Sequence, residues 1–244
     1  MPHYRFYTPD NLNLHENVTL EEEEARHLIR VMRASEGDHV ELINGRGILA
    51  HAHVKEIKKN SCILVVDKLH KEVPSPHSLV LLQGLPKINR LDTILEKATE
   101  LGVNEILLFP GERSEKEGLS VQQTLRAHAI LIAATKQSGR LFLPKISLLP
   151  EIGSWPKMQG ALFYGDVRPQ ATRLWDALQK TREPNIHFCI GPEAGLSEHE
   201  IMLLEEKGFL GVSLHYNILR TDTAPIAALA IISHYLQSST GYLS

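Results

Sequence analysis

Ile186-His187-Phe188-Cys189-Ile190-Gly191-Pro192-Glu193-Ala194-Gly195, followed by Ser197-Glu198-His199-Glu200, is the most informative segment of this chain. Its first five residues form an apolar run that ends in a turn rich in glycine and proline, which predicts a buried strand. Ser197 and Glu200 have the spacing of a capping box, in which each side chain bonds a free amide at the start of a helix. The segment therefore predicts a strand, a tight turn and a helix, the repeating unit of α/β folds.

The same alternation of strands and helices extends over residues 77–244. Further strands are predicted at 79–83, 105–109, 161–164 and 212–214. Helices are predicted from Asn89 to Gly102, from Ser120 to about Gln137, and over residues 224–237. The first of these helices carries an apolar stripe at helical spacing, made of Leu91, Ile94, Leu95, Ala98 and Leu101. This order predicts an α/β domain with a mostly parallel sheet.

The first 72 residues have a different pattern. Thr19-Leu20-Glu21-Glu22 has capping-box spacing and predicts a helix that ends at Gly37-Asp38. Three short strands are predicted at 40–43, 48–57 and 62–69, and Asn44-Gly45 is a strong hairpin signal between the first two. Short strands joined by tight turns indicate a small β-barrel. Val73-Pro74-Ser75-Pro76 is the predicted linker, so we expect domains at 1–72 and 77–244.

Composition sets limits on the class of protein. The chain has 244 residues, 43% of them hydrophobic and 23% charged, with a net charge of −3. These values are typical of a globular protein and argue against binding nucleic acid by overall basicity. We expect a cytoplasmic protein without a membrane span, because no apolar run approaches about 18 residues and the N-terminal segment lacks an apolar stretch of signal-peptide length. Cys62 and Cys189 lie in apolar runs and have no metal-ligand spacing, so we expect no metal site.

Three loops are candidates for a ligand site, because ligands of parallel sheets bind at the carboxyl ends of strands. They are Gly165-Asp166, Gly191-Pro192-Glu193-Ala194-Gly195, and the segment from His215 to Thr223. The two glycines of the second loop fit close backbone approach to a ligand, or equally a tight turn into a helix. The sequence contains no GxGxxG, P-loop or GxSxG motif, so the common dinucleotide, ATP and hydrolase signatures give no support.

Several motifs, in order along the chain, resemble one family. They are His27-Leu28-Ile29-Arg30-Val31-Met32-Arg33 with Gly37-Asp38, Glu96-Lys97-Ala98-Thr99-Glu100-Leu101-Gly102-Val103, Glu112-Arg113-Ser114, Gln137-Ser138-Gly139-Arg140 with Pro144, Ile190-Gly191-Pro192-Glu193 with Gly195, and Ile218-Leu219-Arg220-Thr221-Asp222-Thr223-Ala224. The set spans nearly the whole chain and is similar to the RsmE family of 16S rRNA (uracil-N3)-methyltransferases, of the SPOUT class.

The resemblance implies a fold, a cofactor and an assembly. It implies a PUA-like β-barrel that binds RNA, followed by a SPOUT α/β domain whose backbone forms a trefoil knot. The expected cofactor is S-adenosylmethionine (SAM), held by the knot loops, and the active unit is a homodimer. The substrate is 16S rRNA or the small ribosomal subunit. The cofactor-binding residues carried over by the resemblance are Tyr164, Gly165, Ile190, Gly191, Pro192, Glu193, Gly195, Leu214, His215, Ile218, Leu219, Thr223 and Ala224.

Methylation of uracil N3 needs loss of the N3 proton or stabilisation of the developing anion. An arginine with fixed donors suits the second task, so Arg220 is the first candidate. Glu193 and Asp222 are candidates for the base, although Asp222 also fits an N-cap of the last helix. For Glu193 the alternative is a carboxylate that favours the helix dipole, and for Arg220 it is a plain surface charge.

Candidate RNA contacts lie in both predicted domains. Arg26, Arg30 and Arg33 follow one helical face that can track phosphates, or that can pair with the acidic run at Glu22. The resemblance adds Lys87, Arg90, Arg113 and Arg140 as RNA or active-site contacts. The rival hypothesis is a noncatalytic RNA-binding dimer whose cofactor pocket is degenerate, since His215 stands where the family has glycine. A generic small-molecule α/β enzyme is a third, fold-level alternative.

Overall fold

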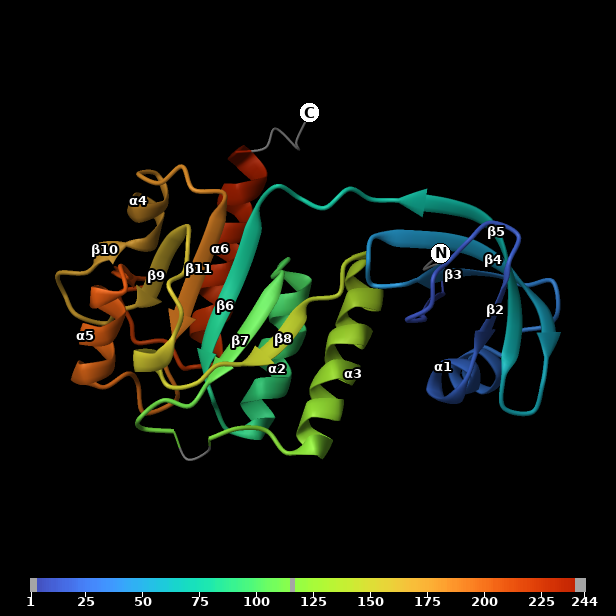
Figure 1. Ribbon diagram of the computed structural model, residues 1–244, viewed down its shortest axis with the longest axis horizontal. Helices are drawn as coiled ribbons and strands as arrows, with labels where there is room; N and C mark the ends of the chain where they lie inside the picture. The colour runs from blue at the N-terminus through green and yellow to red at the C-terminus, as the bar shows by residue number, and fades with distance from the viewer. Residues whose placement is uncertain (1–3, 115–116, 240–244) are drawn as a thin grey trace. The chain divides into compact units, whose positions relative to one another are not determined.

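The computed structural model describes residues 4–114 and 117–239 (Figure 1). The chain divides into two compact units, each with its own core. The first consists of residues 1–74 together with 132–143, and the second of residues 75–131 and 144–244. Within the described residues, none of the helices combines the length and apolar character needed to cross a membrane.

The N-terminal unit is built on a five-stranded sheet in the order β1-β3-β4-β5-β2. Its strands are β1 (Arg5–Tyr7), β2 (Asn17–Leu20), β3 (His39–Ile43), β4 (Ile48–Ile57) and β5 (Cys62–Lys71). The three strands predicted at 40–43, 48–57 and 62–69 are therefore confirmed. Alternate side chains of β4 and β5, such as Ala52, Val54 and Leu64, are buried in one hydrophobic core.

The turn between β3 and β4 follows the predicted hairpin. Asn44 is buried, and its Oδ1 accepts hydrogen bonds from the backbone amides of Arg46 (2.9 Å) and Ile48 (3.2 Å). Gly45 has a φ of +68°, a conformation that strongly favours glycine. Local side-chain chemistry therefore sets this turn, which explains why the sequence predicts it correctly.

The predicted capping box at Thr19 is wrong. Thr19 lies in β2, where it pairs with Ile63 of β5, and α1 (Glu22–Arg26) begins after Glu21 with no side-chain cap. The helix continues as a π-helical turn, η1 (His27–Val31), and so ends well before Gly37. Pairing with a neighbouring strand occupies Thr19, a tertiary effect that local spacing does not reveal.

The second unit contains a seven-stranded sheet in the order β10-β12-β9-β11-β6-β7-β8, and every neighbouring pair is parallel. Its strands are β6 (Ser78–Gly84), β7 (Glu105–Phe109), β8 (Lys145–Leu148), β9 (Ala161–Gly165), β10 (Thr172–Arg173), β11 (Asn185–Ile190) and β12 (Leu210–Ser213). Its helices are α2 (Ile88–Glu100), α3 (Val121–Ser138), α4 (Leu174–Leu178), α5 (Glu198–Glu206), α6 (Thr223–Ser239) and the 3-10 turn η2 (Ile152–Ser154). The last turns of α3 belong to the first unit. The predicted α/β class with a parallel sheet is confirmed.

Both faces of this sheet are covered. On one face Val80 and Leu82 of β6 pack in a cluster with Trp155 and with Leu204 of α5. Leu81 points to the other face, since successive side chains alternate along a strand, and it is fully buried. There α6 lies against β6, β11 and α2 (Figure 1). A central parallel strand buried on both faces is a nearly continuous apolar run, which is why β6, β7 and β11 are readable from sequence.

Six short elements, of two to five residues each, were not predicted: β1, β2, β8, β10, α4 and η2. Of these, β8 and β10 lie at the two edges of the seven-stranded sheet. Such elements carry too few residues for a periodic pattern, and their pairing depends on the neighbouring strand.

Candidate active site: a cofactor cavity and its charged rim

A cavity of about 640 Å³ lies where the chain leaves β9, β11 and β12. These three strands are parallel neighbours in the order β12-β9-β11, so their carboxyl ends meet at one edge of the sheet. The loops that follow them are here named loop 1 (residues 165–168), loop 2 (191–196) and loop 3 (214–221). All three line the cavity, whose volume is in the range of cofactor sites.

Most of the predicted cofactor residues line this cavity. They are Gly165, Ile190, Gly191, Pro192, Glu193, Gly195, Leu214, His215, Ile218, Leu219 and Ala224. Two others do not line it: Tyr164 is fully buried beneath loop 1, and Thr223 is exposed at the first position of α6. The candidate catalytic residue Arg220 lines the cavity, whereas Asp222 does not.

Loop 2 is anchored from below by two buried polar side chains. Gln83, at the end of β6, is 0% exposed, and its Nε2 lies 3.4 Å from Gly191 O and 3.3 Å from Thr221 Oγ1. The Thr221 hydroxyl donates to Gly191 O at 2.9 Å. These bonds join the end of β6, loop 2 and loop 3. A hydrogen-bonded buried network of this kind fixes backbone geometry, because breaking it leaves unsatisfied polar groups.

A second set of contacts ties loop 2 to the turn after β7. Arg113 Nη1 donates to the carbonyl oxygens of Ala194 (3.1 Å) and Leu196 (3.4 Å). Buried Glu200 accepts from the amides of Glu112 and Ser197, and its capping box with Ser197 is confirmed. Arg113, predicted to contact RNA or the active site, holds loop 2 in this structure.

An exposed ion pair lies beside this turn. His199 Nδ1 and Glu112 Oε1 are 2.7 Å apart. The contact raises the pKa of His199 and lowers the pKa of Glu112.

Loop 1 is held by a charged cluster. Arg168 Nε bonds both oxygens of buried Asp166, at 3.0 and 2.8 Å, and its Nη2 bonds Tyr164 Oη and Glu205. Burial, and then the hydrogen bond to Glu205, raise the pKa of Tyr164. The hydrogen bonds to Asp166 and Glu205 raise the pKa of Arg168. Tyr164 thus supports loop 1 from below and makes no contact with the cavity space.

Loop 3 is mostly exposed. Tyr216 and Ile218 are 90% and 81% exposed, and Arg220 has no ion-pair partner among the residues that the structure describes. The ring of His215 turns back on its own loop: its Nδ1 accepts from the Asn217 amide at 3.0 Å, and it stacks on Tyr216 with a centroid distance of 4.2 Å. His215 therefore lines the cavity with its ring held against its own loop.

The backbone of loop 2 differs between Ala194 and Gly195. The non-glycine residues with positive φ, in the part of the chain that is described, are His15, Glu22 and Arg33. Ala194 is not among them, whereas Gly195 has a φ of +74°. Glycine is thus required at the second position and not at the first.

The rim of the cavity carries a charge cluster. Arg90, at the start of α2, lies 3.4 Å from Glu193 Oε1 through its Nε and 3.7 Å from Asp222 Oδ2 through its Nη1. Glu193 Oε1 also accepts from the backbone amide of Lys87 at 3.0 Å. The structure thus brings together both candidate bases and Arg90, which were predicted for different roles.

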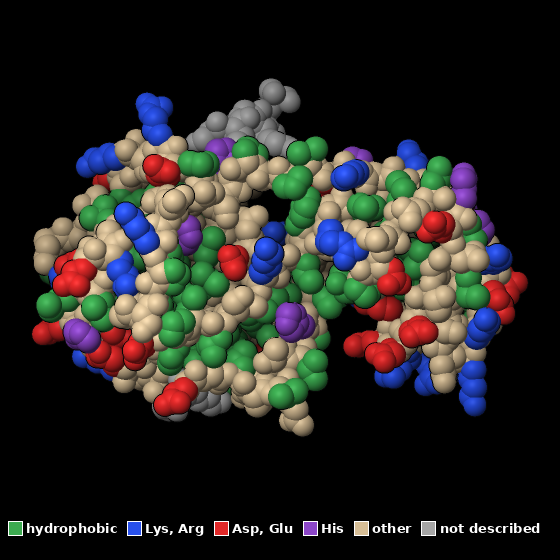
Figure 2. All heavy atoms as spheres, in the orientation of Figure 1, with side chains coloured by type: hydrophobic (Ala, Val, Ile, Leu, Met, Phe, Trp, Pro, Cys, Tyr) green, Lys and Arg blue, Asp and Glu red, His purple; other side chains and the backbone are tan. Residues whose placement is uncertain are grey.

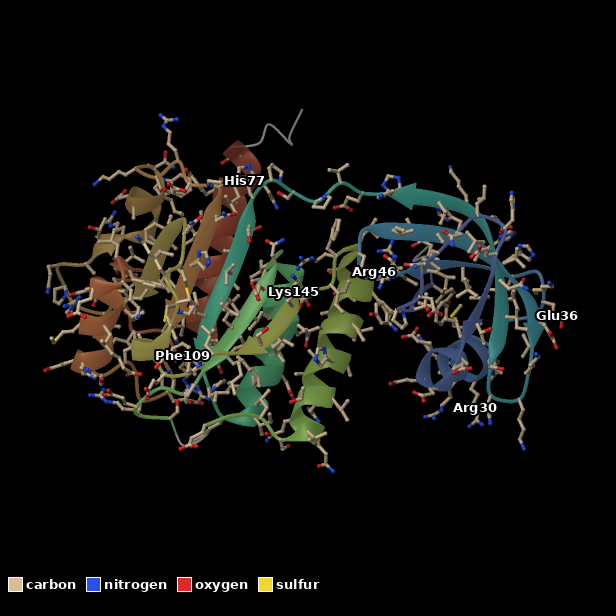
Figure 3. The ribbon with its side chains drawn as sticks, viewed as in Figure 1. Arg30, Glu36, Arg46, His77, Phe109 and Lys145 are labelled. Carbon is tan, nitrogen blue, oxygen red and sulfur yellow. The ribbon has the colours of Figure 1, made fainter. Side chains whose placement is uncertain are left out.

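The predicted RNA contacts of the first unit are exposed. Arg26, Arg30 and Arg33 are exposed, and none of them forms an ion pair within residues 4–114 and 117–239. Figure 3 shows Arg30 on the outside of the unit, directed away from it. Figure 2 shows acidic and basic side chains next to each other where α1 lies. Arg140 differs, because it is half-buried and burial lowers its pKa to about 10.

The cavity fits SAM in its chemistry. Its walls include apolar side chains suited to an adenine ring: Ile190 at the end of β11, Leu196 of loop 2 and Leu219 of loop 3. Carboxylates of Asp166 and Glu193 line it as well, and can face a sulfonium cation. In the described part of the chain, no three His, Cys, Asp or Glu side chains gather as a metal-ligand set.

Comparisons with known proteins agree with this fold and cavity. A model of the RNA methyltransferase domain matches residues 73–233, and a model of the RNA methyltransferase PUA domain matches residues 20–67. These matches place the chain in the class of RNA methyltransferases with an N-terminal PUA domain.

The relatives narrow the class. Ribosomal RNA small subunit methyltransferase E of Bacillus subtilis is 30% identical over 90% of this chain and 90% of its own length. The same enzyme of Aquifex aeolicus is 30% identical over 89% of this chain and 94% of its own length. The chain belongs to the family of ribosomal RNA small subunit methyltransferase E.

Solved structures of similar proteins hold the cofactor. Ribosomal RNA small subunit methyltransferase E of Neisseria gonorrhoeae, bound to S-adenosyl methionine, has a TM-score of 0.83 and 29% identity, covering 95% of this chain and 97% of that one. A Legionella pneumophila protein in complex with the bound cofactor SAM has a TM-score of 0.86 and 26% identity, covering 98% of both chains.

Sequence reasoning missed several residues of this site. Gln83, Asp166 and Arg168 were not among the predicted site residues, yet they hold or line the cavity. Gln83 had one available signal, since it is a single polar residue at the end of the apolar run 79–82. The roles of Arg168 and Thr221 have no such signal, because their partners are distant in sequence.

Proposed function

We propose that this protein transfers the methyl group of SAM to N3 of a specific uridine in 16S rRNA of the small ribosomal subunit. The observation that carries the proposal is the cavity formed by the three loops after β9, β11 and β12, in a chain of this family. SAM supplies an electrophilic methyl group when it is bound.

The cavity-lining residues of loops 1–3 would hold the cofactor, and Tyr164 would support loop 1 from beneath. We infer that loops 2 and 3 belong to a trefoil knot of the SPOUT type. The support is that residues 83, 191 and 221, far apart in the chain, are bonded to one another at the floor of the site.

Methylation of uracil N3 requires stabilisation of the negative charge that develops on the base. Uracil N3 becomes a good nucleophile only as its proton leaves, and negative charge then spreads over O2 and O4. Arg220 lines the cavity with its guanidinium uncommitted in the described structure, so it can stabilise this charge. Glu193 and Asp222 are the candidate proton acceptors, and Arg90 holds both carboxylates in place.

Each unit carries basic side chains that we propose contact RNA. Arg26, Arg30 and Arg33 are exposed and lack ion pairs in the described residues, which favours phosphate contact over pairing with Glu22. Lys87 and Arg113 lie near the cavity rim. Arg140 is half-buried and is the weakest candidate of the set.

We also propose a homodimer. Loop 3 exposes Tyr216 and Ile218 beside the cavity, and a second copy of the chain would cover them. Light scattering of the purified protein should give twice the monomer mass. The cytoplasmic location stays a prediction.

The proposed reaction is tested by nucleoside mass spectrometry. Unmodified small subunits, and separately naked 16S rRNA, are incubated with the protein and SAM and then digested. Appearance of 3-methyluridine supports the reaction, the atom and the substrate together. Its absence while SAM binds would indicate another base or RNA, and absence of SAM binding by calorimetry would favour a noncatalytic RNA-binding protein, an alternative that the open cavity does not favour.

A further inference from the structure

We propose that a second, smaller cavity at the start of α2 receives the flipped uracil, and that Glu193 forms its wall toward the cofactor and accepts the N3 proton. This inference rests on the proposed function and deepens it. The cavity has a volume of about 270 Å³ and is lined by Leu85, Pro86, Lys87, Ile88, Asn89, Arg113, Ser114, Glu193 and Ala194. It is here named the base slot.

The base slot adjoins the cofactor cavity. Arg113, Glu193 and Ala194 line both of them, so these three residues form the boundary between the two spaces. A cofactor in the larger cavity and a base in the slot would therefore be neighbours. The volume suits one pyrimidine ring, since a cavity of about 150 Å³ is enough for benzene.

The slot combines apolar walls with polar side chains. Leu85 and Pro86 are buried and Ile88 is half-buried, which provides surfaces for the faces of a base. Five of the nine lining residues are polar or charged, and the carboxylate of Glu193 is the single acceptor-only side chain among them. A pocket with apolar walls and several hydrogen-bonding groups suits a pyrimidine base, which has apolar faces and a polar edge.

Glu193 has one oxygen available for a ligand. Its Oε1 accepts from the Lys87 amide and faces Arg90 Nε, whereas Oε2 has no partner within residues 4–114 and 117–239. The carboxylate is thus held in place by one oxygen while the other is free. By contrast, Asp222 lines neither cavity and faces Arg90 and Thr223. Glu193 is therefore the better placed of the two candidate acceptors.

The polar set matches the edge of uracil. Uracil presents O2, N3–H and O4, an acceptor, a donor and an acceptor in a row. Glu193 supplies the acceptor, and Asn89 and Ser114 supply side-chain donors: the Asn89 amide has no partner in the described structure, and Ser114 Oγ uses only its acceptor function, toward the Gly111 amide. Cytosine presents an acceptor at N3, which would face the carboxylate unfavourably.

The transfer step balances with these groups. The N3–H electron pair forms the new N3–CH3 bond, and the S–CH3 bond breaks with its electrons kept by sulfur, which becomes a neutral thioether. The N3 proton passes to Glu193 Oε2 and then to solvent.

Two variants with matched controls test the slot in the full-length protein. Glu193→Gln removes the proton acceptor at constant size and should lower kcat by about 100-fold, a much larger change than the rise in the SAM Kd that follows from loss of a carboxylate lining the cofactor cavity. Glu198→Gln, at an exposed carboxylate in the first turn of α5, is the control. Asn89→Phe fills the slot and should lower kcat/KM for RNA by about 30-fold; Thr93→Phe, an exposed residue one turn further along α2, should not.

Binding of uridine 5′-monophosphate, followed by crystal soaking with S-adenosylhomocysteine present, tests the slot independently of turnover. We expect the base between Asn89 and Glu193. A base bound elsewhere, a parallel rise of the SAM Kd in both variants, or unchanged methylation by Asn89→Phe would overturn the slot. If the wild-type protein methylates no rRNA but binds the base there, the proposed reaction fails while the slot stands.

Discussion

Loop 2 and loop 3 line the same cavity but are held very differently. Loop 2 receives bonds from Gln83 and Thr221 below it and from Arg113 beside it. Loop 3 exposes Tyr216 and Ile218, and its main internal bond runs from the Asn217 amide to His215. One wall of the site is thus pre-formed by the fold, and the other is left open to a ligand or a second copy of the chain.

The contrast separates two kinds of residue. A side chain that anchors loop 2 should affect stability and cofactor affinity, since its bonds exist without substrate. A side chain of the exposed part of loop 3, residues 216–220, should affect mainly the reaction, because in the described structure these side chains form no hydrogen bond or ion pair that a substitution would remove. The following predictions test this division.

Arg220→Ala should give the largest effect. Loss of a fixed cationic donor should lower kcat by about 100- to 1,000-fold, with little change in the SAM Kd. The measurement is methylation of small subunits together with calorimetry of SAM binding, and Arg182→Ala, an exposed arginine before β11, is the control. Equal loss of methylation and SAM affinity would mean that Arg220 serves the cofactor.

Thr221→Val should loosen loop 2. The substitution keeps the size but removes the donor to Gly191 O and the acceptor for Gln83, which should cost about 1–3 kcal/mol of unfolding free energy. The SAM Kd should rise by about tenfold. Urea unfolding and calorimetry measure both quantities, and Thr221→Ser, which retains the hydroxyl, should behave like wild type. Unchanged stability would show that this network does not hold the loop.

Arg168→Ala should weaken loop 1 more mildly. Its guanidinium is partly exposed, at 43%, so solvent screens its ion pairs. We expect a SAM Kd raised by about threefold and kcat unchanged at saturating SAM. The pKa of Glu205, which the hydrogen bond from Arg168 lowers, should move back toward its ordinary value, as followed by carboxyl NMR. An unchanged Glu205 pKa would contradict the observed cluster.

The His199–Glu112 pair should give the smallest effect. Because the pKa of His199 is raised in the folded protein, the pair stabilises the fold at pH values below the unfolded pKa of His199, near 6.5. This stabilisation is lost as pH rises through the folded pKa of His199. Because the pKa of Glu112 is lowered in the folded protein, the stabilisation from this pair is also lost at low pH, as pH falls through the folded pKa of Glu112, which lies below 4.5. The Tm difference between wild type and His199→Asn should therefore be largest at weakly acidic pH, about 1 °C, and should vanish above pH 8. A difference that grows with pH would contradict the pairing.

Much of the fold was predictable, for a physical reason. The buried strands β6, β7 and β11 are apolar runs, and α2 shows its stripe at 3.6-residue spacing, with Leu91, Ile94, Leu95 and Ala98 buried as expected. The helix after loop 2 begins at its predicted capping box. The capping box predicted at Thr19 was wrong, because Thr19 pairs with Ile63 of β5, which is distant in sequence, and this pairing outweighs the local capping pattern.

In the candidate site, the positions of the loops were predictable from the sequence and the contacts that hold them were not. Chain order and strand ends alone place loops 1–3 at one edge of the sheet, and 11 of the predicted cofactor residues line the cavity there. The supporting contacts were not predictable, because Gln83 and Thr221 are 138 residues apart and Arg113 and Ala194 are 81 apart. Neither pair shares a local pattern that would link its members.

The sequence by itself determined the class of the fold, the position of the cofactor loops and the family, because these depend on short apolar runs, turns and motifs that are local in the chain. Only the tertiary structure decided which side chains hold those loops, that His215 turns back on its own loop, and that Glu193 separates two cavities with one oxygen free. Such features depend on contacts between distant segments, whose geometry is fixed by the packed sheet and not by any local pattern.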